Sequence, residues 1–314
     1  PISERIALRS AAAAERSAQQ TFSTVAAQYI AQHERAWKNV KHAAQWTATL
    51  KAYAEPVVGS LLVRDVTTAH VIQVLEPIWL TKTETATRVR SRMELVLDFA
   101  TARGYRAGPN PARWRGHLDA ALPKPSRVAT VRHHVAVAVD DAAAFMKRLR
   151  SQAGNGARAL EFAILTAARS GEVRAAVWAE FDLHASLWTV PAARMKSGRE
   201  HRVPLSGTAL ALLHCQPRGE AEDLVFPGIR GKLSDMSLTA VLRRMHVEAT
   251  VHGFRSTFRD WVSERTEYSS EVAEMALAHA VGDKVEAAYR RGDLFEKRVR
   301  VMADWAGFLN GDHS

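Results

Sequence analysis

The chain has 314 residues, of which 47% are hydrophobic and 24% are charged, as in soluble globular proteins, and this length predicts about two domains. No apolar run approaches the roughly 18 residues of a membrane span, residues 1–17 do not resemble a secretory signal, and the single cysteine excludes a disulfide within the chain. The formal net charge is +10, and residues 1–134 carry 19 Lys and Arg against 10 Asp and Glu. We expect a cytoplasmic protein whose N-terminal part either holds a polyanion or presents a solvated basic surface.

Apolar residues three or four apart predict helices over residues 21–35, 37–54, 67–77 and 81–103. The last of these has two distinct faces. Its apolar stripe is formed by Val89, Met93, Val96, Leu97 and Ala100. A second stripe, with spacing i, i+4, i+7 and i+11, is formed by Thr81, Thr85, Arg88 and Arg92. Hydroxyl and guanidinium groups in a row are suited to phosphates or base edges in a DNA groove, although a solvated polar face has the same pattern.

The second half of the chain predicts further helices and one β-hairpin. A short helix near 111–121 precedes a proline-containing linker at 122–134, whose adjacent histidines lack the nearby acids or thiols of a metal site. Helical periodicity then runs from 140 to 168, and the alternating segments SLWTV and HRVPL flank a turn at Ser197 and Gly198. Helices follow at 206–214, 235–247, 252–265, 270–279, 282–290 and 294–309. The predicted fold class is mainly α with a small antiparallel β-sheet.

Cationic residues follow in an order that suits phosphate chemistry. Arg169 lies at the end of an apolar helix, where its guanidinium can grip two oxygens, and Glu172 can fix that guanidinium or begin the next helix. Lys196 lies in the hairpin turn and can donate a proton to a departing alkoxide. Each residue also has a structural interpretation, as a surface arginine after a helix or a solubilising hairpin lysine, and Arg194 and Arg199 are neighbours that could be confused with Lys196.

The segment VHGFRSTFRDWV predicts a helix with a core face and a cationic face. Its aromatic residues recur as a core stripe, whereas His252, Arg255 and Arg259 share another face near the helix N-terminus, where a phosphate is favoured. His279 follows an apolar run and can donate a hydrogen bond to a phosphate oxygen, or can be an ordinary core histidine. Tyr289 is the candidate nucleophile, because cations nearby can activate a phenol, with Tyr268 as the weaker candidate.

The ordered set Arg169, Lys196, His252, Arg255, His279 and Tyr289 resembles the tyrosine recombinase family. The segments AARSGEVRAAVW, MKSGREHRVPLS, TVHGFRSTFRDW and LAHAVGDKVEAAYRRGDLFEKR are similar to those of prophage and genomic-island integrases. In the N-terminal half, TKTETATRVRSRMELVLDFATARGY and NPARWRGHLD resemble the core-binding domain of that branch.

The resemblance implies a role for each matching residue. Arg169 and Arg255 would clamp the scissile phosphate with His279, Lys196 would protonate the 5′-oxygen, His252 would assist proton transfer, and Glu172 would support the site. Tyr289 would form a 3′-phosphotyrosine that a 5′-hydroxyl of another strand attacks, so that neither a metal nor ATP is implied. We expect double-stranded DNA attachment core sites as the substrate, a homotetramer on DNA, and accessory DNA-bending or excision proteins as further partners. The DNA-contacting residues would be Lys82, Thr85, Arg88, Arg92, Arg199 and Arg259.

The resemblance also implies a domain organisation. Residues 1–20 would be the remnant of an arm-binding domain that this chain lacks, 21–121 a helical core-type DNA-binding domain, 122–134 the interdomain linker and 135–314 the catalytic domain. The linker departs from the family pattern, because HHVAVAVDD has no proline after its histidines. Two other functions use similar features: DNA relaxation by a type IB topoisomerase, and DNA binding by a catalytically silent regulator.

Overall fold

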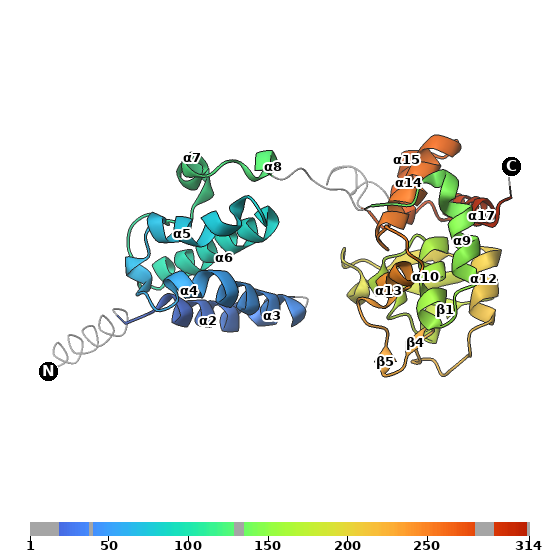
Figure 1. Cartoon of the computed structure of the whole chain (residues 1–314). Coiled ribbons are helices and arrows are strands. Elements are labelled where there is room, and N and C mark those ends of the chain that lie inside the picture. Colours follow the sequence, from blue (N-terminus) through green and yellow to red (C-terminus); the bar gives the residue numbers. More distant parts are fainter. Residues whose placement is uncertain (1–18, 38–39, 129–134, 280–291, 313–314) are drawn as a thin grey trace. The chain divides into compact units, whose positions relative to one another are not determined.

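The computed structural model describes residues 19–37, 40–128, 135–279 and 292–312. The chain divides into two compact units, residues 1–132 and 133–314, and each has its own hydrophobic core (Figure 1). The predicted class is confirmed: both units are largely helical, and the second contains small antiparallel sheets. The helix predicted at 282–290 lies outside the described residues.

The first unit is built from helices. Its α-helices are α2 (Phe22–His33), α3 (Val40–Thr49), α4 (Glu55–Val58), α5 (Thr68–Trp79), α6 (Thr83–Ala102), α7 (Asp119–Ala121) and α8 (Pro125–Val128). Short 3-10 turns occupy η1 (Glu34–Ala36) and η3 (Val63–Asp65), and π turns occupy η2 (Leu50–Ala54) and η4 (Trp114–Leu118). Helix α6 packs on α2 and α5 and carries much of the core. The predicted apolar stripe of α6 is confirmed, because all five of its side chains are fully buried.

Two predictions in the first unit needed correction. The short helix expected at 111–121 is mostly irregular, because Arg115 is extended and Gly116 adopts φ 69°, so that only the three residues of α7 form an α-helix. The helical turn α8 lies within the segment 122–134, whose assignment as the linker stays a prediction. Helix α5 also continues two residues past its predicted end and contains Pro77, which has no N–H to donate to the carbonyl four residues earlier.

The second unit combines helices with two small sheets. Its helices are α9 (Ala142–Arg150), α10 (Asn155–Leu165), α11 (Ser170–Val173), α12 (Gly207–His214), α13 (Ser237–Arg244), α14 (Gly253–Arg265), α15 (Ser270–Ala276) and α17 (Phe295–Asn310). Turns of 3-10 type occupy η5 (Val139–Asp141), η6 (Trp178–Glu180) and η7 (Ala192–Arg194). The strands are β1 (Phe181–Asp182), β2 (Leu187–Val190), β3 (His201–Pro204), β4 (Pro227–Gly228) and β5 (Gly231–Lys232).

The predicted hairpin is confirmed. Strands β2 and β3 pair antiparallel, with Val190 opposite His201 and Leu187 opposite Pro204, and β1 adds a third strand beside β2. The connecting segment 191–200 contains η7 and then a turn in which Gly198 has φ 70°. The second sheet, β4 paired with β5, was not predicted because each strand has only two residues.

The single helical stretch predicted over 140–168 is instead two helices. Helix α9 ends at Arg150, and Gly154, with φ 93°, precedes α10. The guanidinium of Arg158 in α10 closes the break by donating to the carbonyls of Leu149, Arg150 and Gln152 at 3.0–3.1 Å. An arginine from the next helix thus satisfies carbonyls that the end of α9 leaves without a helical partner.

Helix α17 packs on its own unit. It contacts α9, α10, α12, α15 and β3, and Trp305 is fully buried, with its indole N–H donating to the carbonyl of Ile164 at 2.9 Å. Arg298 is 1% exposed and donates from Nε to the carbonyl of Asp293 at 2.7 Å and from Nη2 to its carboxylate at 2.6 Å. It also donates to the carbonyl of Arg202 in β3. The start of α17 is therefore fixed to the hairpin strand.

The imidazole of His201 in β3 lies near the charged groups of Arg298, Glu172 and Arg169. Burial lowers the pKa of His201 to about 4, helped by Arg298 and opposed by Glu172 and by a hydrogen bond to the backbone of Ala276. The ring is therefore neutral in the folded protein at pH values where an exposed histidine is already charged.

We predict that His201 makes the second unit sensitive to acid. In the unfolded chain His201 has a pKa of about 6.5 and binds a proton below that pH, whereas in the folded protein it binds one only near pH 4. The free energy of unfolding should therefore fall as pH decreases through this window, by on the order of 2–3 kcal/mol from this residue alone. His201→Gln should flatten this part of the stability–pH curve in urea unfolding at pH 7.0, 5.5 and 4.5. His184→Gln, an exposed histidine in the same unit, is the control; equal pH dependence of both variants and wild type would contradict the prediction.

Candidate active site

Arg169 is held at a helix junction by Glu172. The chain leaves α10 through Ala167, which has φ 50°, and Arg169 is the N-terminal flanking residue of α11. Both carboxylate oxygens of Glu172 bind this residue, Oε2 accepting from the backbone N–H and Oε1 from Nη1, each at 2.9 Å. Glu172 is 6% exposed, whereas Arg169 is half-buried. Glu172 therefore orients a guanidinium whose far side remains accessible.

Arg255 is buried in the first turn of α14. Its side chain donates from Nη1 to the carbonyl of Ala167 and from Nη2 to the carbonyl of Leu277, the latter at 2.6 Å. Its Nε has no hydrogen-bond partner among the described residues. Burial, together with the positive charge of Arg169, lowers the pKa of Arg255 to about 10, while Glu172 and Glu274 oppose the shift. The guanidinium remains charged at neutral pH, but it lies in a place where its charge is incompletely balanced.

The two arginines and His279 converge on one short stretch of backbone after α15. Nη2 of Arg169 lies 3.5 Å from the carbonyl oxygen of Leu277 and 3.3 Å from that of Ala278. Nη2 of Arg255 lies 3.0 Å from Nε2 of His279. Three of the six predicted catalytic residues therefore meet at one place, as their proposed role requires. The long contacts of Arg169 leave its donors available to a stronger acceptor.

His279 is exposed, and Glu274 holds its ring. Nδ1 of His279 lies 2.6 Å from Oε2 of Glu274, and the backbone N–H of His279 donates to the carbonyl of Glu274 at 2.9 Å. Arg259 donates from Nε to Oε1 of Glu274 at 2.7 Å. Burial raises the pKa of Glu274, but the hydrogen bonds from Arg259 and His279 outweigh burial and lower it on balance. The sequence pattern did not reveal Glu274, because nothing in a helical period marks the partner of a histidine.

His252 and Lys196 lie at the surface of the second unit. His252 is the exposed N-terminal flanking residue of α14, three positions before Arg255. Lys196 and Arg199 are exposed in the loop between β2 and β3. Arg194 is different: it is half-buried and donates to the carboxylate of Glu180 and to the backbone carbonyl of Glu172. Arg194 therefore supports the turn that carries Arg169, a role that its position in the hairpin sequence did not indicate.

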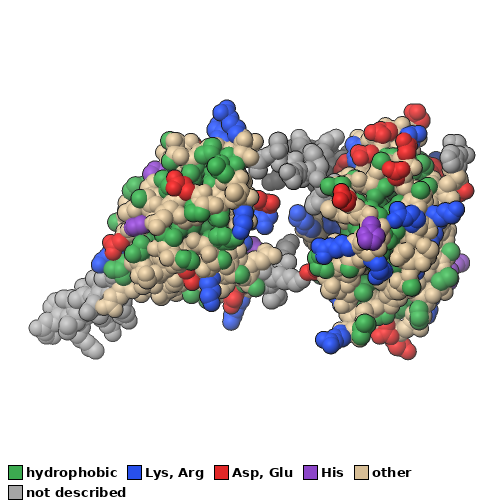
Figure 2. Space-filling view, in the orientation of Figure 1, with side chains coloured by type: hydrophobic (Ala, Val, Ile, Leu, Met, Phe, Trp, Pro, Cys, Tyr) green, Lys and Arg blue, Asp and Glu red, His purple; other side chains and the backbone are tan. Residues whose placement is uncertain are grey.

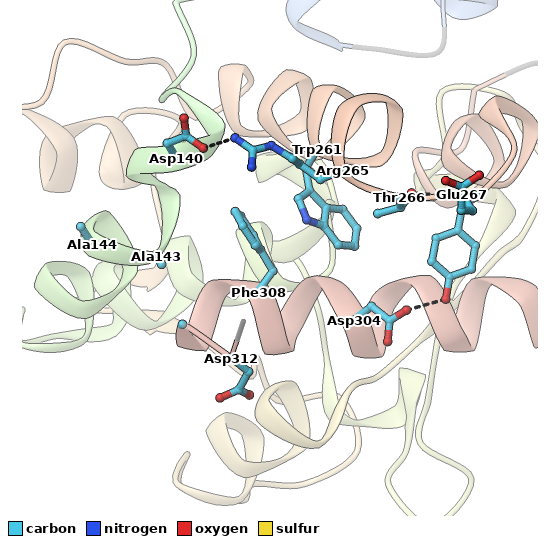
Figure 3. Close-up of a pocket in the computed structure, with 12 residues that line it drawn as sticks. Asp140, Ala143, Ala144, Trp261, Arg265, Thr266, Glu267, Asp304, Phe308 and Asp312 are labelled. Carbon is cyan, nitrogen blue, oxygen red and sulfur yellow. Dashed lines mark hydrogen bonds and ion pairs between the residues drawn. The ribbon is translucent and has the colours of Figure 1, made fainter. Parts of the chain in front are cut away.

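Tyr289 lies outside the described residues, but its rival Tyr268 can be assessed. The Tyr268 hydroxyl donates to the carboxylate of Asp304 on α17 at 2.6 Å, in a pocket of about 930 Å³ whose lining includes Trp261 and Phe308 (Figure 3). Burial and the Asp304 carboxylate raise the pKa of Tyr268 to about 12. A phenol with this pKa beside a carboxylate is a poor nucleophile at neutral pH. No arginine or histidine of the converging cluster lines this pocket.

In the first unit, the predicted Thr/Arg stripe is only partly exposed. Thr81 and Arg88 are exposed and Thr85 is half-buried, and Arg88 forms an ion pair with Glu84. Lys82, a predicted DNA contact outside the stripe, is also exposed. Arg92 is buried: Nη1 donates to the carbonyl of Gln45 at 2.8 Å, and its guanidinium lies 5.3 Å from the centre of the Trp46 ring. Between α3 and α6 lies a groove of about 330 Å³ lined by His42, Gln45, Trp46, Thr87, Arg88, Ser91, Arg92 and Leu95. The groove adds polar side chains that the stripe alone did not identify.

Lys and Arg side chains are spread across the visible face of the second unit, with a histidine among them (Figure 2). In the described part of the chain, no helix combines the length and apolar character needed to cross a membrane.

Comparisons with known proteins agree with this geometry. The phage integrase central domain family matches residues 22–117, and the phage integrase family matches residues 137–293. The integrase of Enterobacteria phage P4 is 30% identical over 324 aligned positions, which cover 95% of this chain and 71% of that protein. Among solved structures, a lambda integrase(75–356) dimer bound to a COC′ core site has a TM-score of 0.64 and 18% identity, covering 85% of this chain and 97% of that one. A lambda integrase tetramer bound to a Holliday junction has a TM-score of 0.63 and 18% identity, covering 84% and 80%.

The family matches cover most of both units, and the phage P4 relative extends over nearly the whole chain. The chain therefore belongs to the phage integrase family and is a DNA-binding tyrosine recombinase, an enzyme that recombines DNA at specific sites.

Proposed function

We propose that Arg169, Arg255 and His279 bind the scissile phosphate and that Tyr289 attacks it. The observation that carries this proposal is the convergence of the two guanidiniums on the backbone carbonyls of Leu277 and Ala278, with the imidazole of His279 beside Arg255. Two like charges held this close destabilise each other unless an anion joins them. A phosphate supplies that anion, and charge-assisted bonds from arginine to phosphate are stronger than the long carbonyl contacts of Arg169.

In the proposed reaction, the scissile phosphoryl group is transferred from the 5′-oxygen of the DNA to the hydroxyl oxygen of Tyr289. The Tyr289 hydroxyl attacks phosphorus and passes its proton to His252, and the bond from phosphorus to the 5′-oxygen breaks, leaving a 3′-phosphotyrosine. Lys196 donates a proton to the departing 5′-oxygen, and His252 assists proton movement. A 5′-hydroxyl from another strand then attacks the phosphotyrosine and releases Tyr289. The energy of the original ester is kept throughout, so the exchange requires neither ATP nor a metal.

Glu172 supports this chemistry indirectly. It fixes the backbone and the guanidinium of Arg169 together, and Arg194 holds the carbonyl of Glu172 in turn. A rigid donor needs little reorganisation when negative charge develops on the phosphate, which is the main source of electrostatic catalysis. The junction between α10 and α11 is therefore part of the proposed active site.

We also propose that the first unit binds duplex DNA through α6 and the groove beside it. Lys82, Thr85 and Arg88 remain the proposed contacts on α6, whereas Arg92, which is committed to Gln45 and Trp46, would hold the groove together. In this view residues 21–121 form the core-type DNA-binding domain, 122–134 the linker and 135–314 the catalytic domain. Arg199 on the hairpin loop would add a phosphate contact.

The proposed assembly is a homotetramer on two attachment core sites. A lambda integrase with the same fold forms a tetramer on a Holliday junction, which is the four-way intermediate that strand exchange between two duplexes requires. The proposed setting is the bacterial cytoplasm, at the nucleoid, where the enzyme would integrate or excise a mobile element such as a prophage with accessory DNA-bending or excision proteins.

We predict that Tyr289→Phe abolishes the covalent adduct but keeps DNA binding, because only the attacking oxygen is removed. Nicked duplexes that carry a candidate core site would be incubated with the full chain and analysed on a denaturing gel. Tyr268→Phe is the matched control and should form adduct at the wild-type rate, since its hydroxyl is bound to Asp304. An adduct that survives Tyr289→Phe would assign the nucleophile elsewhere, and relaxation of plasmids without a preferred site would favour topoisomerase activity.

We predict that Arg88→Ala weakens binding to all duplexes and lowers the salt dependence. Loss of one phosphate contact should reduce the slope of log K against log salt by about 1. Arg64→Ala removes another exposed arginine of the first unit and should leave the slope unchanged. Fluorescence anisotropy with labelled duplex at several salt concentrations measures both slopes. A reduced slope for Arg64→Ala but not for Arg88→Ala would move the DNA interface to another face.

A further inference from the structure

A chain of polar contacts runs from α14 through α15 to the proposed phosphate site. Arg259 binds Oε1 of Glu274 at 2.7 Å, Oε2 of Glu274 lies 2.6 Å from Nδ1 of His279, and Nε2 of His279 lies 3.0 Å from Nη2 of Arg255. Every link joins a charged or ionisable group to the next one. The four side chains come from two helices and the turn that follows α15.

These contacts decide which nitrogen of His279 carries the proton. The lowered pKa of Glu274 keeps its carboxylate ionised at neutral pH, and an ionised carboxylate can only accept hydrogen bonds. Nδ1 of His279 must therefore be the donor to Glu274. In the neutral ring this leaves Nε2 as an acceptor, which faces the donors of the Arg255 guanidinium, and a proton bound at Nε2 makes it the donor that a phosphate oxygen requires. The tautomer of His279 is thus fixed from both sides.

Glu274 also fixes the position of the ring. The backbone N–H of His279 donates to the Glu274 carbonyl at 2.9 Å, while the side chain of His279 binds the Glu274 carboxylate. Between them, Ala278 adopts φ 50°, which turns the chain so that both bonds form with the same residue. A histidine that is 41% exposed would otherwise sample several rotamers.

Arg259 is occupied by this arrangement. Its Nε binds Glu274 and its Nη1 donates to the hydroxyl of Ser263. The sequence pattern placed Arg259 on the cationic face of α14 and suggested a DNA contact. The observed hydrogen bonds indicate a different role: Arg259 binds the carboxylate of Glu274, and that carboxylate binds the imidazole of His279.

We propose that Glu274 is a positioning residue for His279 and that Arg259 positions Glu274. This inference rests on the proposed function, in which His279 acts at the scissile phosphate. Glu274 does not touch the DNA or the reacting atoms. It sets the tautomer and direction of the imidazole before DNA arrives, so that this orientation is not lost to the free rotation of an exposed side chain.

The test measures single-turnover formation of the covalent adduct on a nicked duplex at saturating protein, together with the Kd for an intact duplex. Glu274→Ala should slow adduct formation by about 10- to 100-fold, the usual cost of removing a group that orients a functional side chain. Glu274→Gln keeps an acceptor oxygen and should give an intermediate rate. The Kd should stay within a factor of about two for both variants, since Glu274 makes no proposed DNA contact. Glu264→Ala, an exposed acid on α14, is the matched control and should keep the wild-type rate.

A double-mutant comparison separates positioning from other effects. In a His279→Ala background, Glu274→Ala should cause no further slowing, because Glu274 acts only through His279. A full additional loss in that background would overturn the proposal, as would a wild-type rate for Glu274→Ala. Failure of the wild-type chain to form any adduct would instead refute the proposed function itself.

Arg259→Gln provides the second arm. It should slow adduct formation less than Glu274→Ala does, leave the salt slope of DNA binding unchanged, and have no effect in the Glu274→Ala background. A slope reduced by about 1, with a normal adduct rate at saturation, would show that Arg259 contacts a phosphate and would overturn its assignment as a positioning residue.

Discussion

The proposed site depends on holding two like charges together without an anion. Arg169 and Arg255 both direct donors at the carbonyl of Leu277, and Arg255 is almost completely buried. Burial of Arg255 and its repulsion by Arg169 destabilise the charged guanidinium, and both lower the pKa of Arg255. The fold supports it with carbonyl acceptors at Ala167 and Leu277 and with the buried carboxylate of Glu172. In the proposed phosphate site the pair would thus be organised before the DNA binds, so that the free energy of reorganisation is met during folding rather than during the reaction.

Periodicity predicted the elements that carry these residues, because burial in a helix or strand follows directly from spacing. The apolar stripe of α6 and the β2–β3 hairpin were found in this way. The core face of α14 was also predicted, and Phe254, Phe258 and Trp261 are all buried. The spacing of residues did not predict local structure that depends on a partner from another helix. The break between α9 and α10 depends on Arg158 satisfying three carbonyls, which a continuous helical pattern conceals.

The same limit applies to single arginines. A cationic stripe on a helix indicates which side chains share a direction, but not whether each meets solvent or another element. Arg92 belongs to the predicted stripe of α6, yet it is buried against Gln45 and Trp46 of α3. Arg259 belongs to the cationic face of α14, yet it binds Glu274 of α15. Both partners come from a different helix, so they could not be read from the sequence of the helix itself.

The shared acceptor at residue 277 is a main-chain oxygen, and this affects how the site can change as sequences diverge. No replacement of the Leu277 side chain removes the carbonyl that both guanidiniums use, so residue identity there is constrained mainly by packing. The position of this carbonyl depends instead on the backbone conformation, in which Ala278 has φ 50°. Glycine or asparagine tolerates this conformation, whereas a β-branched residue does not. Divergence that spares every proposed catalytic side chain would therefore still disrupt the proposed anion site through one β-branched residue at position 278.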